Sequence, residues 1–159
     1  MRKMTVCFAM ALFLGFGLRL AVGTPTVPSE VAGQPLAHVH QGAEARAEVE
    51  RLHGKNIGMR DGFVAHYGGG SSAAMLYVSQ AQNEAAARQQ VEQMTARIRS
   101  STGPFTHLRE STRFGLTVYS ALGQGQVHYY FRRGSAVVWL AADASIAREA
   151  LAEAVSKLR

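Results

Sequence analysis

The chain has 159 residues, a formal net charge of +6 and a single cysteine, a length that suits one domain with a substantial core. Cys7 lies among the first 23 residues, so the rest of the chain has no thiol for a disulfide, a zinc–thiolate centre or an iron–sulfur cluster. Beyond residue 23 the net charge is +3 and the basic residues are scattered, which argues against nucleic-acid binding because that needs a clustered basic patch.

The first 23 residues have the three parts of a secretory signal peptide. Arg2 and Lys3 give a positive start, residues 4–18 are apolar, and small residues precede a cleavage site after Gly23. The apolar run has 15 residues, fewer than the roughly 20 that a membrane-spanning helix needs. We therefore expect a periplasmic or secreted protein with no membrane span after cleavage; retention of the signal as an anchor is the alternative.

Residues 24–41 are expected to form a flexible tether, and residues 42–159 a single domain. The tether carries three prolines among small residues, a composition typical of extended linkers: Pro25, Pro28 and Pro35. A short amphipathic helix is predicted at residues 43–52, with Gly54 in position to end it.

The remaining elements alternate strands with helices. Strands are predicted at residues 63–67, 73–79, 105–111, 116–122, 127–131 and 136–142, and a glycine-rich turn at 68–72. One helix is predicted at 82–100, and Asp143 or Ser145 is placed to cap a last helix. This order indicates an α+β fold, a two-layer sandwich of a mainly antiparallel sheet with the helices on one face.

The sequence also indicates an internal duplication of a β-β-α unit. Segment 65–67 matches 127–129, and segment 74–78 matches 136–140, both at an offset of 62 residues. The apolar stripes of the two longer helices match at an offset of 64. The alternative is that any two hairpin-helix units are similar at this level.

Alternation along the strands assigns residues to two faces of the sheet. One face is aliphatic and expected to lie under the longer helices: Phe63, Ala65, Tyr67, Ala74, Leu76, Val78, Leu116, Val118, Val127, Tyr129, Phe131, Ala136, Val138 and Leu140. The other is aromatic and expected to have no long helix over it: His66, Met75, Tyr77, Thr117, Tyr119, His128, Tyr130, Val137 and Trp139.

The aromatic face supplies the candidate binding residues, because side chains with an apolar body and a polar tip suit a partly wet contact surface. They are His66, Tyr77, Tyr119, His128, Tyr130 and Trp139. The ligand would be a small molecule or an envelope protein, and no cofactor is indicated. The alternative is a structural face, covered within the protein or by a second copy in a homodimer.

His38 and His40 have the spacing of a metal-binding pair. Two histidines are fewer than the three or four ligands of most zinc sites, and His53 is expected to lie too far along the helix to join them. The alternative is a pair of solvated side chains at the end of the tether.

No catalytic motif is evident, so the favoured hypothesis is a non-enzymatic exported binding module. The chain has neither a Gly-x-Ser-x-Gly elbow nor the lysine of a phosphate-binding loop. The second hypothesis is a small periplasmic metal-handling protein or a hydrolase-like enzyme that uses His66, His128 and Tyr130.

Overall fold

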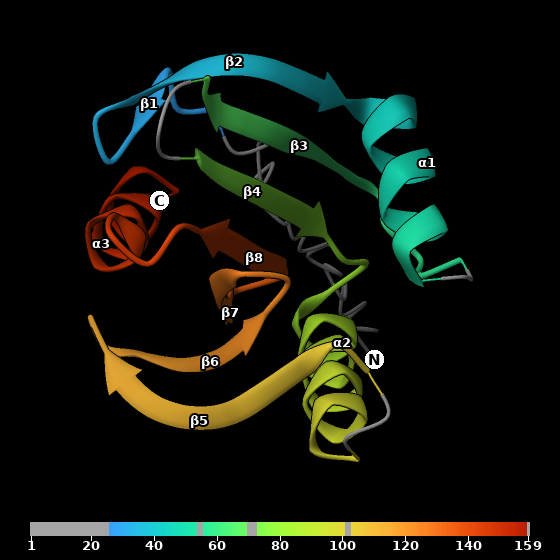
Figure 1. The fold of residues 1–159 in the computed structure, drawn as a ribbon. Helices are drawn as coiled ribbons and strands as arrows, with labels where there is room; N and C mark the ends of the chain where they lie inside the picture. The colour runs from blue at the N-terminus through green and yellow to red at the C-terminus, as the bar shows by residue number, and fades with distance from the viewer. Residues whose placement is uncertain (1–25, 54–55, 70–72, 101–102, 159) are drawn as a thin grey trace, which may run out of the picture.

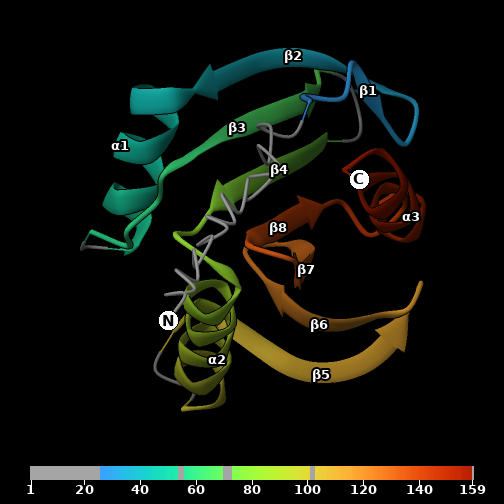
Figure 2. The same ribbon diagram turned by 180° about the vertical axis from the view of Figure 1, so that it is seen from behind.

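The computed structural model describes residues 26–53, 56–69, 73–100 and 103–158. The predicted signal peptide, Gly54 and residues 70–72 of the glycine-rich turn lie outside these ranges. The described residues form one antiparallel sheet and its flanking helices (Figure 1 and Figure 2). In chain order the elements are β1 (Glu30–Val31), β2 (Gln34–Gln41), α1 (Gly42–His53), β3 (Asp61–Gly68), β4 (Ala73–Gln80), α2 (Glu84–Arg99), β5 (Phe105–Arg113), β6 (Leu116–Gly123), β7 (Gln126–Arg133), β8 (Ala136–Ala142) and α3 (Ala147–Lys157).

The sheet has the strand order β1-β2-β3-β4-β8-β7-β6-β5, and neighbouring strands are antiparallel. The predicted α+β sandwich with an antiparallel sheet is confirmed. β3 pairs with β4 and β7 pairs with β8 as hairpins, and the pairing of β4 with β8 joins the two halves of the sheet. The sheet bends so that β2 and β5 curve toward the same side, around α3 (Figure 1).

α3 lies on the concave side and packs on the predicted aliphatic face. Its residues Ala150, Leu151 and Ala154 are almost fully buried. They join one core cluster with side chains from both halves of the sheet, among them Phe63, Ala65, Tyr67, Leu76, Val78, Val118, Phe131, Val138 and Leu140. Alternation along the strands therefore identified this face correctly.

The aromatic face is not free of helices, which corrects the prediction. α2 buries an apolar stripe against Tyr130 and Val137, and α1 buries Ala45 and Val49 against Val64. Both helices therefore lie on the convex side, opposite α3 (Figure 2). The physical reason is that helical periodicity shows that a helix buries one stripe but not which face of a sheet receives it.

The segment expected to be a tether contains two strands. β1 and β2 pair across a tight turn at Ala32 and Gly33, which both have positive φ. Val31 is fully buried in the core around α3. β2 pairs with β3 along most of its length, so residues 34–41 belong to the sheet.

The helix caps differ in part from expectation. Asn83 caps α2, and its side-chain oxygen accepts a hydrogen bond from the Ala86 amide at 2.9 Å. Ile146 occupies the N-cap position of α3 and supplies no side-chain hydrogen bond. Neither Asp143 nor Ser145 takes that position. The Asp143 carboxylate instead accepts the Ala73 amide of β4 at 2.8 Å, so it joins neighbouring strand ends.

The geometry of the two halves bears on the proposed duplication in two ways. Tyr77 of β4 pairs with Trp139 of β8, and the 62-residue offset also equates these residues. The helices that follow β4 and β8, however, pack on opposite faces of the sheet. Duplication therefore stays a prediction.

Candidate functional site

Three histidines lie together on the convex side of the sheet. His38 of β2 pairs with His66 of β3 in the strand register, and His40 lies two residues further along the same face. Together with Glu44 and Glu48 of α1 they define the histidine cluster.

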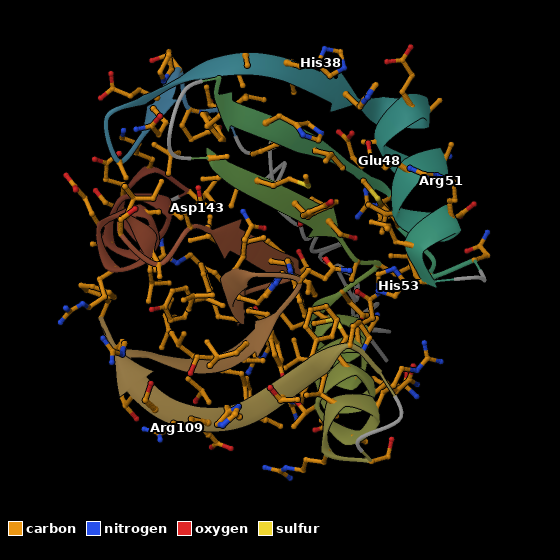
Figure 3. The ribbon with its side chains drawn as sticks, in the orientation of Figure 1. His38, Glu48, Arg51, His53, Arg109 and Asp143 are labelled. Carbon is orange, nitrogen blue, oxygen red and sulfur yellow. The ribbon has the colours of Figure 1, made fainter. Side chains whose placement is uncertain are left out.

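The two glutamates reach the cluster because β2 runs into α1 without a loop. Gly42 has φ of 54°, a left-handed conformation that glycine adopts without strain, and the chain turns there from strand to helix. Glu44 and Glu48 are one helical turn apart and therefore share a face. Figure 3 shows Glu48 on the side of α1 that faces β3, with His38 near the end of β2.

The imidazole rings of the cluster are neighbours, and two of their nitrogens are in close contact. His38 Nε2 and His40 Nε2 are 3.0 Å apart, and the His66 ring centroid lies 6.0 Å from that of His38 and 6.4 Å from that of His40. Glu44 Oε2 lies 3.4 Å from His40 Nδ1, and Glu48 Oε2 lies 3.7 Å from His40 Nε2. Each nitrogen of His40 thus faces a carboxylate.

The cluster is partly open to solvent. The His38 residue is exposed and His66 is half-buried, while 34% of the His40 side chain and 15% of the Glu48 side chain are accessible. Small ligands therefore have access from the solvent side, whereas Glu48 is largely enclosed. As the side chains of the described residues are placed, no group of three or more His, Cys, Asp or Glu could hold a metal ion, so metal binding by this cluster requires side-chain movement.

Tyr77 lies on the inner side of this region, and its hydroxyl donates to Met75 Sδ. Burial raises the pKa of Tyr77 to about 12, and the Glu48 carboxylate adds to the increase while Arg51 opposes it. The phenol is therefore protonated at neutral pH. It acts as a hydrogen-bond donor and not as a general base.

A second group, the aromatic cluster, lies beneath α2. It consists of Phe105, Tyr119, His128, Tyr130 and Trp139. The rings of Tyr119, Tyr130 and Trp139 form a continuous stack, with centroid separations of 4.9 and 5.1 Å. Phe105 packs edge-on against both His128 and Trp139.

Polar groups of the aromatic cluster bond within the protein. The Tyr130 hydroxyl is 2.9 Å from Thr95 Oγ1 of α2, and Trp139 Nε1 donates to His128 Nδ1 at 3.1 Å. Tyr130 is completely buried and His128 is 2% exposed. Their contacts join α2 to the sheet, which favours the structural alternative for these two residues.

The candidate residues from the sequence thus divide between two places. His38, His40 and His66 come together, and Tyr77 lies beside them; Tyr119, His128, Tyr130 and Trp139 form the aromatic cluster. His66 and His128 lie in one row across the sheet, separated by Met75 and Ala141. Three strand spacings, about 14 Å, lie between their backbones, so the two imidazoles do not act on one reacting atom.

Sequence reasoning missed the two glutamates of the histidine cluster. Glu44 and Glu48 are four residues apart, and Glu44 is four residues from His40. This spacing was the available signal. That signal becomes meaningful only when α1 is known to start directly after β2. Thr95, the buried partner of Tyr130, had no sequence signal beyond its place on α2.

No family model, no curated protein and no solved structure matches this chain. Across the described residues, no helix is long and apolar enough to cross a membrane.

Proposed function

We propose that this domain binds a borderline divalent transition-metal ion, copper(II) or zinc, through His38, His40 and His66. Glu48 supplies an oxygen ligand, and Glu44 orients His40 through its Nδ1. The observation that carries the proposal is the 3.0 Å separation of His38 Nε2 and His40 Nε2, with a carboxylate on each nitrogen of His40.

The distances agree with a shared metal ion. Ligand bonds of about 2.0–2.1 Å in tetrahedral geometry separate neighbouring ligand atoms by about 3.3 Å. The two imidazole nitrogens are 3.0 Å apart, and Glu48 Oε2 is 3.7 Å from His40 Nε2. These two values bracket the ideal separation, so each of these two pairs of atoms has nearly the spacing of neighbouring ligands on one ion.

His66 requires a somewhat larger adjustment. Two imidazoles bound through Nε2 to one tetrahedral ion would have ring centroids about 5 Å apart. The observed separations are 6.0 and 6.4 Å, about an ångström more. The proposal therefore requires the half-buried His66 ring to rotate toward the other two rings.

The donor set selects the class of metal. Imidazole nitrogens with a carboxylate suit zinc and copper(II), whereas calcium and magnesium prefer oxygen donors throughout. The Glu44 contact with His40 Nδ1 resembles the carboxylate that commonly orients a ligating histidine. The partial exposure of the site supports reversible binding, as in a metal-handling module, and the expected export would place it outside the cytoplasm.

Calorimetric titration of the full chain with zinc and with copper(II) tests the proposal. We expect one ion per chain and loss of at least about 100-fold in affinity in the double variant His38→Ala, His40→Ala, since it retains only one imidazole. Glu44→Gln should weaken binding by about tenfold, as expected for an orienting carboxylate. Binding should also weaken in acid, because protons compete for the ligand nitrogens.

The matched control is His53→Ala, His107→Ala, which removes two histidines outside the cluster. Its affinity for the metal should equal that of the parent chain. An absence of binding by the parent, or equal losses in the two double variants, would show that the histidine cluster is not a metal site.

A further inference from the structure

A hollow lies on the opposite, concave side of the sheet, over β5, β6 and β7. Its volume is about 290 Å³, and its lining includes Arg109, Arg113, Ser120, Leu122, Val127 and Tyr129. This is just below the usual volumes of small-molecule sites, about 300 to 1,000 Å³, so the hollow suits a small ligand. It does not involve the histidine cluster, which lies on the convex side.

The strand register places two arginines beside the hollow. Arg109 pairs with Ser120 and Arg113 with Leu116 across β5 and β6, so both arginines occupy alternate positions that face the concave side. Figure 3 shows Arg109 on β5, which is an edge strand of the sheet. Both arginines therefore contribute to the lining of the same hollow, four residues apart along β5.

Some arginines of this molecule are paired with carboxylates. Arg99 pairs with Glu110, and Arg132 with Glu84. None of the ion pairs found in the described part of the chain includes Arg109 or Arg113. Arg113 Nε donates to Ser111 Oγ at 3.4 Å, a neutral partner that leaves its charge uncompensated.

The floor of the hollow is apolar. Leu122 is 44% exposed, which makes it one of the few large hydrophobic side chains on the described surface, and Val127 pairs with it on the same face. The ring of Tyr129 continues this floor from β7. An apolar body lying on these side chains would cover Leu122 and gain burial free energy.

We propose that this hollow binds a small organic anion, with a carboxylate or phosphate head between Arg109 and Arg113 and a short apolar body over Leu122 and Val127. Guanidinium groups bind such oxyanions with paired, charge-assisted hydrogen bonds. The Ser120 hydroxyl, in the same lining, is a further donor for the head.

Calorimetry on the full chain tests this site with four probes: octanoate, octyl phosphate, octanol and inorganic phosphate. We expect octanoate or octyl phosphate to bind one per chain, and the stronger of the two identifies the preferred head group. Octanol lacks the charge and inorganic phosphate lacks the apolar body, so each should bind at least about tenfold more weakly.

The decisive variant is Arg109→Gln, Arg113→Gln, which should weaken the preferred probe by about tenfold or more, because it removes both charge-assisted contacts. The matched control is Arg88→Gln, Arg97→Gln, an equal charge change at two exposed residues of α2, and it should bind as the parent does. The proposal is overturned if no probe binds, if octanol binds as well as octanoate, or if the two double variants lose affinity equally.

Discussion

At His128, both ring nitrogens face partners that suit the uncharged imidazole. Trp139 Nε1 donates to Nδ1 at 3.1 Å, and Nε2 donates to the Gly123 carbonyl at 2.9 Å. A second proton would place an N–H donor at Nδ1 against the indole N–H. Burial lowers the pKa of His128 below its usual range, although the hydrogen bond to Gly123 acts in the opposite direction.

This lowered pKa predicts a pH dependence of stability. In the unfolded chain His128 takes up a proton near its ordinary pKa of about 6.5, whereas the folded protein resists protonation until lower pH. The stabilisation that uncharged His128 contributes to the folded state is therefore fully present above about pH 6.5 and decreases as the pH falls below that value. Urea unfolding at several pH values should show a shallower loss of unfolding free energy in His128→Gln than in the parent chain.

The control for this prediction is His107→Gln, because His107 is exposed. Its unfolding free energy should follow the parent's pH dependence. Each unit of difference between the folded and unfolded pKa contributes about 1.4 kcal/mol, so a comparison at neutral and mildly acidic pH resolves even a modest shift. Parallel curves for all three proteins would show that His128 does not contribute.

At the scale of elements, the aromatic cluster holds α2 against the sheet. Trp139 of β8 stacks on Tyr130 and contacts Phe105 at the start of β5, while Tyr130 bonds to Thr95 of α2. We expect Trp139→Ala to lower the unfolding free energy by about 3 kcal/mol, as in other large-to-small core substitutions. Circular dichroism during urea unfolding measures this loss, since the variant lacks the only tryptophan.

Two further variants separate packing from surface effects. Trp139→Phe preserves most of the stack and should cost less than Trp139→Ala. Phe114→Ala removes an aromatic side chain that is 59% exposed and should change stability by no more than about 0.5 kcal/mol. If Trp139→Ala proved as stable as the parent, the aromatic cluster would again be a candidate binding surface.

The sequence predicted elements well where they have a strong local pattern. β8 was expected at residues 136–142 and forms Ala136–Ala142, because its apolar run is continuous. β2 was missed because it carries Pro35 and only two large apolar residues, Leu36 and Val39, neither of which is fully buried. Its pairing with β3 is long-range, so the chain around it contains no equivalent signal.

The candidate site required information from a larger scale. The His-x-His spacing identified His38 and His40, and strand alternation placed His66 on the convex face. Their meeting depends on the register between β2 and β3, and the approach of Glu48 depends on the direction of α1. A local pattern encodes neither of these, since both result from packing between segments.

For the whole molecule, curvature of the sheet separates two kinds of surface. The convex side carries the histidine cluster beside α1, with two carboxylates that favour a cation. The concave side carries α3 and, next to it, the hollow with Arg109 and Arg113. The two proposed sites therefore have opposite electrostatic character, and binding at one can be tested without disturbing the other.

The segment before β2 closes the concave side over α3. Val31 is completely buried there, the Tyr67 hydroxyl donates to the Pro28 carbonyl at 3.0 Å, and Lys157 Nζ donates to the Glu30 carbonyl at 2.8 Å. These contacts join the first described residues to β3 and to the last helix. A flexible tether would not make these contacts.

Two shortened chains test this role. A chain that begins at Thr24, as expected after signal cleavage, keeps every one of these contacts and should be as stable as the full chain. A chain that begins at Gln34 loses β1 and should be about 3 to 5 kcal/mol less stable, from burial of one valine, about 2 kcal/mol, and two hydrogen bonds of about 1 kcal/mol each. Urea unfolding gives both values. Equal stability of the two shortened chains would restore the tether interpretation.

The expected cleavage of the signal peptide has a separate test. Intact-mass measurement of the exported protein should show a start near Thr24, whereas recovery of the full-length chain in membranes would show an uncleaved anchor.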